Sequence, residues 1–168
     1  SGGPVAIIVM GVSGCGKSSV GALLAERLGV AFIEGDALHP KANVDKMAMG
    51  TPLTDDDRWP WLDTIGAEIA ASLKRGAGIV VSCSALKRVY RERLRLATGG
   101  RLRFVYLHGS RALLTERMGA RTGHFMPLSL LDSQLATLEV PTGEPGVVTV
   151  DIDQSLEGIV ADAMRGLG

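Results

Sequence analysis

The sequence lacks the features that mark several classes of protein. Its 18 Lys and Arg residues balance 18 Asp and Glu, so no overall attraction to nucleic acid or to an anionic membrane is expected, although basic residues can still gather locally. The longest apolar run, Val5–Met10, is far shorter than the about 20 residues of a membrane span. No basic-then-apolar signal opens the sequence, and Cys15 and Cys83 form neither a metal-ligand cluster nor a disulfide framework. We therefore expect a reduced, cytoplasmic protein.

What is present indicates one folded domain over residues 1–168, since 46% of the residues are apolar and 21% charged. Short β-rich apolar runs alternate with segments of helical spacing. Strands are expected at 5–10, 31–33, 79–81, 102–107 and 147–150, and helices at 17–28, 40–49, 54–76, 87–96, 110–118, 128–138 and 155–164. This alternation predicts a three-layer α/β/α fold with a mostly parallel five-stranded sheet. Ligands of such sheets bind beyond the carboxyl ends of the strands.

A glycine-rich loop follows the first predicted strand. Gly11-Val12-Ser13-Gly14-Cys15-Gly16-Lys17-Ser18 fits G-x-x-x-x-G-K-[ST] at every fixed position and opens a helix, which a merely glycine-rich turn need not do. Such a loop turns backbone N–H groups around phosphate oxygens, its lysine contacts the β- and γ-phosphates, and its hydroxyl binds Mg²⁺. The nucleotide-binding residues expected here are Gly14, Cys15, Gly16, Lys17, Ser18 and Ser19, with Ser18 as the metal ligand. Cys15 is either a modification-sensitive thiol or a passive loop residue.

Acidic and imidazole side chains follow the second predicted strand. Asp36 is a candidate base for an attacking hydroxyl, or a holder of a Mg²⁺-bound water. The alternative is an aspartate that caps a helix or a turn. His39, directly before Pro40, either contacts substrate or has a capping or packing role.

A run of three aspartates, Asp55–Asp57, precedes Arg58 and two tryptophans. Acidic residues favour a helix N-terminus, so capping by Thr54 or Asp55 is expected. Arg58 either binds a substrate carboxylate or pairs with a neighbouring aspartate. For the tryptophans, packing is favoured over a platform for sugar stacking.

Polar and basic residues follow the third predicted strand. Ser84 lies directly after it, and Lys87 and Arg91 are four residues apart, so the two cations share a helix face. Beside a phosphate-binding loop this face suits an anionic substrate. The alternative is a solvated basic face that continues along the same helix.

Two further arginines, Arg117 and Arg121, are also four residues apart and lead into Gly123 and His124. We interpret the segment at about 119–127 as a lid that closes over the transferring phosphate, with a plain surface turn as the alternative. This interpretation depends on the placement of Lys17 in the phosphate-binding loop.

Several longer segments resemble one family. The stretch Gly35-Asp36-x-Leu38-His39-Pro40, the stretch Asp55-Asp56-Asp57-Arg58-x-Pro60-Trp61-Leu62 and the stretch Cys83-Ser84-Ala85-Leu86-Lys87 are similar to those of the thermoresistant gluconokinases. The resemblance runs from about residue 7 to 160. It implies the P-loop kinase fold and ATP-dependent phosphorylation of D-gluconate to 6-phospho-D-gluconate, with ATP and Mg²⁺ as cofactors.

The resemblance also implies roles for individual residues. Its catalytic residues would be Lys17, Asp36, Arg117 and Arg121; its gluconate-binding residues Asp36, His39, Arg58, Ser84, Lys87, Arg91 and His124; and its residues at the adenine end Asp153 and Gln154, with Arg117 also binding ATP. A homodimer is a further implied feature. The alternatives are a P-loop kinase for another small anion, such as shikimate or a nucleotide, and a nucleotide-binding regulator without catalysis.

Overall fold

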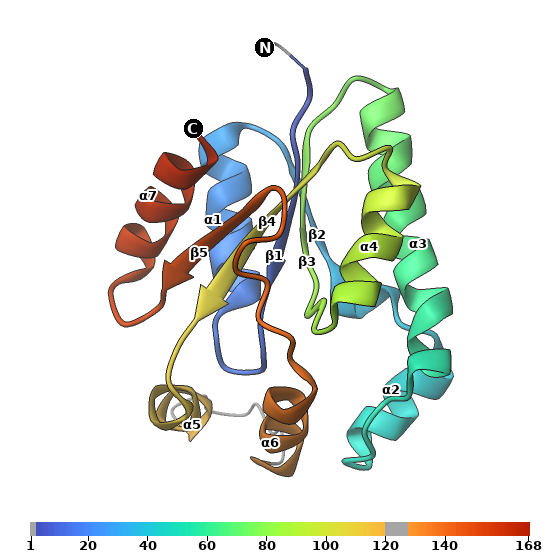
Figure 1. The fold of residues 1–168 in the computed structure, drawn as a ribbon, viewed down its shortest axis with the longest axis vertical. Helices are drawn as coiled ribbons and strands as arrows, with labels where there is room; N and C mark the ends of the chain where they lie inside the picture. Colours follow the sequence, from blue (N-terminus) through green and yellow to red (C-terminus); the bar gives the residue numbers. More distant parts are fainter. Residues whose placement is uncertain (1–2, 120–127) are drawn as a thin grey trace.

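A parallel sheet forms the centre of the computed structural model, which describes residues 3–119 and 128–168. The strands are β1 (Ala6–Met10), β2 (Ala31–Glu34), β3 (Ile79–Ser82), β4 (Leu102–His108) and β5 (Val147–Asp151). Within the described residues they form one five-stranded sheet in the order β2-β3-β1-β4-β5, and every pairing is parallel (Figure 1). The predicted fold class is therefore confirmed, with a sheet that is parallel throughout.

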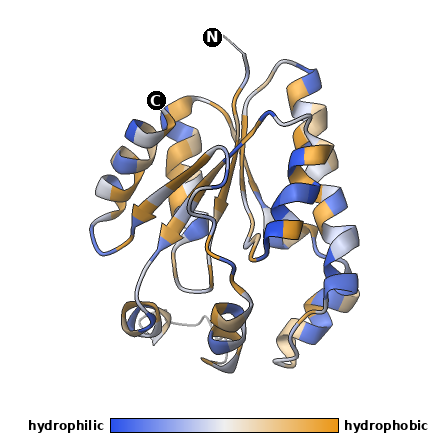
Figure 2. Ribbon diagram, in the orientation of Figure 1, coloured by the Kyte–Doolittle hydropathy of each residue, from blue (hydrophilic) through white to orange (hydrophobic). Residues whose placement is uncertain are grey.

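The strands form where apolar residues follow one another without alternation. Every residue of β1 and of β3 is buried, as expected for strands covered on both faces. The strands are accordingly hydrophobic in Figure 2, whereas the helices carry hydrophilic residues along their outer sides. The phosphate-binding loop thus starts from a fully buried strand of the sheet.

The helices lie in two layers and at one end of the sheet. Their bounds are α1 (Lys17–Leu28), α2 (Lys41–Ala48), α3 (Asp55–Lys74), α4 (Arg88–Ala97), α5 (Arg111–Gly119), α6 (Leu128–Thr137) and α7 (Leu156–Leu167), with a 3₁₀ turn η1 (Gly35–Leu38) after β2. Helices α1 and α7 pack together on one side of the sheet, and α3 and α4 on the other. Helices α2, α5 and α6 lie at the end to which the strands point (Figure 1). That end holds the candidate site.

Local signals place most helix ends within one or two residues of the prediction. Thr54 caps α3 in a reciprocal capping box with Asp57, and Gly29 ends α1 with a left-handed φ of 69°. The prediction was wrong for α7, which runs to Leu167 and not to 164. Its last turn packs Gly166 against Val148 of β5, a tertiary contact that helical spacing alone does not reveal.

Helix α3 supplies much of the core, as its apolar spacing predicted. Trp61, Leu62, Ile65 and Ile69 are all 1% exposed or less, which confirms a packing role for Trp61. In the described ranges, no helix is both long and apolar enough to cross a membrane.

Candidate active site

The predicted phosphate-binding loop connects β1 to α1. Gly14 has a φ of 87°, and a Cβ there would lie 2.9 Å from Met118 Cγ and 3.0 Å from the Leu114 carbonyl oxygen, so glycine lets α5 approach the loop closely. The Lys17 ammonium donates a hydrogen bond to the Val12 carbonyl at 3.2 Å and stays over the loop. The backbone N–H of Gly11 donates to the Ser84 carbonyl at 3.3 Å and links the loop to the segment after β3.

A carboxylate lies beside the predicted metal ligand. The Ser18 hydroxyl donates to Glu34 Oε1 at 2.6 Å, and the Ser82 hydroxyl donates to the same oxygen, also at 2.6 Å. Glu34 ends β2, so the sheet brings it to the start of α1. A serine hydroxyl and a carboxylate are oxygen ligands of the kind that Mg²⁺ prefers, and Mg²⁺ keeps several waters besides one or two protein ligands. The residues present therefore fit the expected magnesium ion.

Close backbone packing holds the neighbouring Gly35 and Asp36. A Cβ at Gly35 would collide with the Ser82 carbonyl oxygen, and the indole N–H of Trp61 donates to the Gly35 carbonyl at 2.8 Å. The Asp36 side chain is 62% exposed and, among the described residues, caps no helix. Asp36 therefore lies in a turn, as one of the alternatives expected, but its carboxylate caps none of the described helices and is open to a ligand.

His39 is held as a neutral imidazole. Its ring stacks on Trp61 with centroids 3.9 Å apart, and burial lowers its pKa to about 4. The charge of Asp36 raises the pKa, and the charge of Arg58 lowers it. Asn43 Nδ2 lies 3.1 Å from His39 Nδ1 and donates to the Asp57 carbonyl at 2.9 Å. Because this amide nitrogen only donates, Nδ1 accepts and the proton lies on Nε2. Nε2 is 4.0 Å from Asp36 Oδ1, so His39 presents a neutral donor beside the open carboxylate.

One pocket collects most of the predicted substrate-binding residues. We call it the Asp36 pocket. The predicted residues that line it are Lys17, Asp36, His39, Arg58 and Ser84. Its other polar lining includes Ser13, Ser133 and Gln134, of which the last two come from α6. Residues from the phosphate loop, η1, α3, the β3–α4 segment and α6 therefore meet at the carboxyl edge of the sheet.

Arg58 and Lys87 lie at the rim of this pocket and are already paired. Arg58 donates to the Tyr90 hydroxyl at 2.9 Å, and Tyr90 in turn donates to Asp55. Burial, together with the hydrogen bond to Asp55, raises the pKa of Tyr90 to about 12, so its hydroxyl stays protonated. Lys87 pairs with Asp55 at 3.0 Å and lines a neighbouring open hollow together with Arg58, not the Asp36 pocket.

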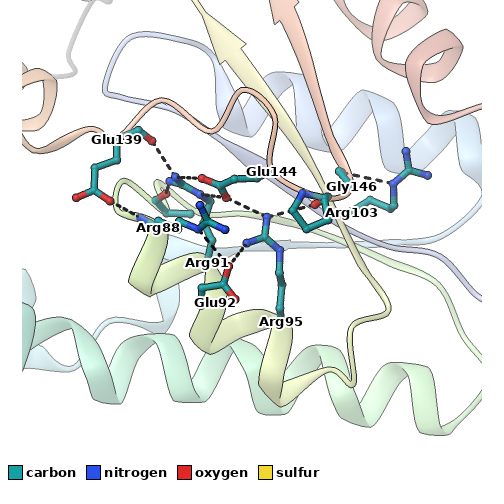
Figure 3. A network of polar contacts seen from close by, with 10 residues as sticks. Arg88, Arg91, Glu92, Arg95, Arg103, Glu139, Glu144 and Gly146 are labelled. Carbon is teal, nitrogen blue, oxygen red and sulfur yellow. Dashed lines mark hydrogen bonds and ion pairs between the residues drawn. The ribbon is translucent and has the colours of Figure 1, made fainter.

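Arg91 does not line the Asp36 pocket, which corrects its assignment as a substrate-binding residue. Its side chain is 0% exposed and pairs with Glu144 at 2.6 Å (Figure 3). It also donates to the backbone carbonyls of Ala85 and Glu139, at 2.7 and 2.8 Å. Although Arg91 shares a helix with Lys87, its guanidinium faces the protein interior, where its hydrogen-bonding capacity is engaged.

A second pocket lies on the other side of the phosphate loop. This Arg117 pocket is lined by Gly14, Cys15, Gly16, Ser19, Val20, Arg117, Gln154, Leu156 and Ile159. Arg117 reaches from α5 to the Ile152 carbonyl at 2.6 Å. The structure thus brings together most of the residues predicted to bind nucleotide. Asp153 is not in this lining; its backbone N–H donates to the Asp151 carboxylate at 2.8 Å.

Several assignments cannot be compared with the structure. Arg121, His124 and all but the first residue of the predicted lid at 119–127 lie outside the described residues. Cys15 and Cys83 are both fully buried, and burial raises the pKa of the Cys83 thiol to about 12. The loop thiol is therefore covered in this structure.

Glu34, Ser13 and Gln134 are site residues that the sequence interpretation did not assign. Glu34 carried a usable signal, since it ends a strand at the edge where ligands bind. Gln134 carried none, because it contacts Ser13 across 121 residues of chain. Only the folded arrangement places that amide against the phosphate loop.

A phosphate-binding loop at the edge of a parallel sheet, with one pocket on each side of it, defines the protein as a P-loop kinase. A family model described as an AAA domain matches residues 7–141. A gluconokinase of Gluconobacter oxydans is 49% identical over 96% of this chain and 90% of its own. The thermoresistant gluconokinase of Escherichia coli is 44% identical over 94% of this chain and 90% of its own.

Solved structures agree with these relatives. The crystal structure of a gluconokinase from Sinorhizobium meliloti 1021 superposes with a TM-score of 0.91 at 59% identity, covering 98% of this chain and 91% of that one. The chain therefore belongs to the gluconokinases within the AAA-domain family.

Proposed function

We propose that this protein transfers the γ-phosphoryl group of ATP to the terminal hydroxyl of D-gluconate and so forms 6-phospho-D-gluconate. The observation that carries the proposal is that Lys17 and Asp36 line one pocket. Most of the other residues assigned to the nucleotide line the Arg117 pocket across the loop. Nucleotide and sugar acid then approach the loop from opposite sides, with Lys17 between them.

Lys17 and Asp36 would have the central roles. The Lys17 ammonium stabilises charge on the transferring group, and the Asp36 carboxylate accepts the proton of the attacking hydroxyl. Ser18 and Glu34 would hold Mg²⁺ at the start of α1. The ion, when bound, neutralises charge on the β- and γ-phosphates. Arg117 would bind ATP from its own pocket, and roles for Arg121 and His124 stay predictions.

The remaining polar groups of the Asp36 pocket suit a polyhydroxy acid. Two cations, Lys17 and Arg58, line it, and Lys17 is assigned to the phosphoryl group, so we assign the substrate carboxylate to Arg58. Lys87, paired with Asp55 at the rim, would assist from outside. The Nε2–H of the neutral His39 imidazole and the Ser84 hydroxyl would bind substrate hydroxyls.

The proposal is tested by ADP release from ATP and Mg²⁺ with D-gluconate, beside its epimers, shikimate and nucleoside monophosphates. We expect turnover with gluconate and 6-phospho-D-gluconate as the product. Turnover with another acid would favour a different small-molecule kinase. ATP binding without transfer to any acceptor would favour a regulator.

An isosteric variant tests the base. Asp36→Asn should lower kcat more than it changes KM for ATP, because the amide cannot take the proton. The matched control is Asp45→Asn, since Asp45 is exposed on α2 and pairs only with Lys41 among the described residues. An effect confined to ATP affinity would instead make Asp36 a positioning or metal-side residue.

The cellular setting and assembly belong to the same proposal. Both cysteines are buried, which suits a reducing, cytoplasmic compartment where ATP is available. The homodimer that the family resemblance implies stays a prediction, and light scattering at catalytic concentrations tests it.

A further inference from the structure

A glutamine from α6 reaches the phosphate loop. Gln134 Oε1 accepts hydrogen bonds from the Ser13 backbone N–H at 2.7 Å and from the Ser13 hydroxyl at 3.1 Å. A backbone N–H only donates, so the atom facing it is the amide oxygen and not the amide nitrogen. The orientation of the Gln134 side chain follows from this contact.

The same peptide unit holds Lys17. The Val12 carbonyl accepts from the Lys17 ammonium at 3.2 Å, and the nitrogen of that Val12–Ser13 peptide donates to Gln134. The carbonyl oxygen and the nitrogen of a peptide are joined through one carbon, so Lys17 Nζ and Gln134 Oε1 are at most about 8 Å apart. Gln134 lines the Asp36 pocket and is absent from the described lining of the Arg117 pocket. It therefore lies at the γ-phosphate end of the loop.

The other end of the amide is open. Within residues 3–119 and 128–168, Gln134 Nε2 has no hydrogen-bond acceptor, and it is not among the buried polar atoms that lack a partner. With the oxygen anchored on the loop, the two N–H groups remain to donate toward a ligand in the Asp36 pocket.

The chain after α6 is fixed to the rest of the protein. The Glu139 backbone N–H donates to the Leu86 carbonyl at 2.8 Å, and the Arg88 backbone N–H donates to Glu139 Oε1, also at 2.8 Å. The buried pair of Arg91 and Glu144 holds the next stretch against α4 (Figure 3). Leu131 on α6 is fully buried. Gln134 is thus presented from an anchored helix.

We propose that Gln134 is a catalytic residue that donates a hydrogen bond from Nε2 to an oxygen of the γ-phosphoryl group in transfer, an inference that rests on the proposed function. In that step the bond from γ-phosphorus to the β,γ-bridging oxygen breaks and its electron pair leaves with ADP. The bond from phosphorus to the sugar-acid oxygen forms, and the hydroxyl proton passes to Asp36. Gln134 gains and loses no proton; it stabilises negative charge on the transferred group.

Two substitutions separate this role from simple support of the loop. Gln134→Glu keeps an acceptor for the Ser13 N–H but replaces the donor by a negative charge facing the phosphoryl group. Gln134→Ala removes both the acceptor oxygen and the donor nitrogen of the amide. We expect kcat to fall about 100-fold or more in Gln134→Glu, and at least as far as in Gln134→Ala, since loss of one such donor costs 10²–10³ in rate. Ala136→Glu adds the same charge at an exposed position of α6 and should keep the wild-type rate.

A Gln134→Glu variant with near wild-type kcat would overturn the proposal. If only Gln134→Ala were slow, the residue would merely hold Ser13. Wild-type enzyme without gluconate turnover would instead refute the proposed function, so nucleotide affinity is measured by calorimetry as well. In Gln134→Glu the Kd of AMP-PNP should rise about 10-fold or more while that of ADP, which has no γ-phosphate, stays within about twofold. Equal changes for both nucleotides would also overturn the proposal.

Discussion

Replacing Arg91 by methionine should destabilise this protein substantially. The guanidinium donates two hydrogen bonds to the carboxylate of Glu144 and one each to the carbonyls of Ala85 and Glu139. The two side chains of the pair are 0% and 7% exposed. Removing one partner of a buried pair costs about 3–5 kcal/mol, because the remaining charge stays buried and uncompensated.

Arg95 moderates the loss. It donates at 3.0 Å to Glu144 Oε1, which also accepts from Arg91 Nε, and would partly compensate the orphaned carboxylate. We therefore expect the lower end of the range, about 3 kcal/mol, which for a chain of this length lowers Tm by roughly 6–12 °C. Circular dichroism during heating measures this shift directly.

The matched control is Arg93→Met on the same helix. Arg93 pairs with Asp63 on the surface, where the two side chains are 44% and 55% exposed, so its loss should lower Tm much less than the loss of Arg91. The reasoning would be refuted if Arg91→Met lowered Tm no further than Arg93→Met.

The pH dependence provides a second measurement on the same pair. Burial alone would raise the pKa of Glu144, but hydrogen bonds from Arg91 and then Arg95 outweigh it and hold the pKa below its usual value. A lowered pKa in the folded state stabilises the protein above the unfolded pKa, and this contribution is lost as the pH falls through the folded value. The difference in Tm between wild type and Arg91→Met should therefore shrink in acid, below about pH 4.

Three further predictions concern the site. Lys17→Ala should lower kcat about 100-fold or more with an unchanged Tm, because charge on the γ-phosphoryl group loses its stabilisation; wild-type turnover in a coupled assay would contradict the assignment. Glu34→Gln should raise the Mg²⁺ concentration for half-maximal rate by about 10-fold, with an unaltered KM for gluconate, and an unchanged Mg²⁺ titration would remove Glu34 from the metal site. For His39, a folded pKa of about 4 lies below the unfolded value, so the unfolded chain binds the additional proton. Wild-type Tm should fall from pH 6.5 toward pH 4, and His39→Gln should flatten that slope; equal slopes would show that His39 is not the cause.

The sequence predicted the fold and the phosphate loop because their causes are local. The run before Gly11 is apolar at every position, and a strand buried on both faces needs little more information. The capping of α3 by Thr54 likewise depends on a residue three positions away. Where a structure is decided within one turn or one strand, the residues in sequence suffice to predict it.

The contacts that were missed depend on distant partners. Lys87 and Arg91 have the spacing of one helix face, yet Lys87 pairs at the rim while Arg91 is buried against Glu144, 53 residues along the chain. Nothing near Arg91 announces that carboxylate. Gln134 and Ser13 are even farther apart in sequence. The neutral state of His39 depends on burial, to which the stacked Trp61 contributes, and the position of its proton depends on Asn43; only the folded chain provides both.

The close passage of Gly35 past the Ser82 carbonyl fixes the spacing of the two carboxylates at the reacting end of the site. Glu34, beside the Ser18 hydroxyl, and Asp36, in its pocket, flank that glycine, and Cα atoms two residues apart are separated by at most about 7 Å. Closing motions elsewhere leave this covalent spacing unchanged. We expect acceptors with one carbon more or fewer to be distinguished instead by the apolar lining of the pocket, Leu53 and Leu130. The spacing of the two carboxylates at the reacting end is set by the backbone, whereas selectivity for acceptor length can change by substitutions at these apolar positions.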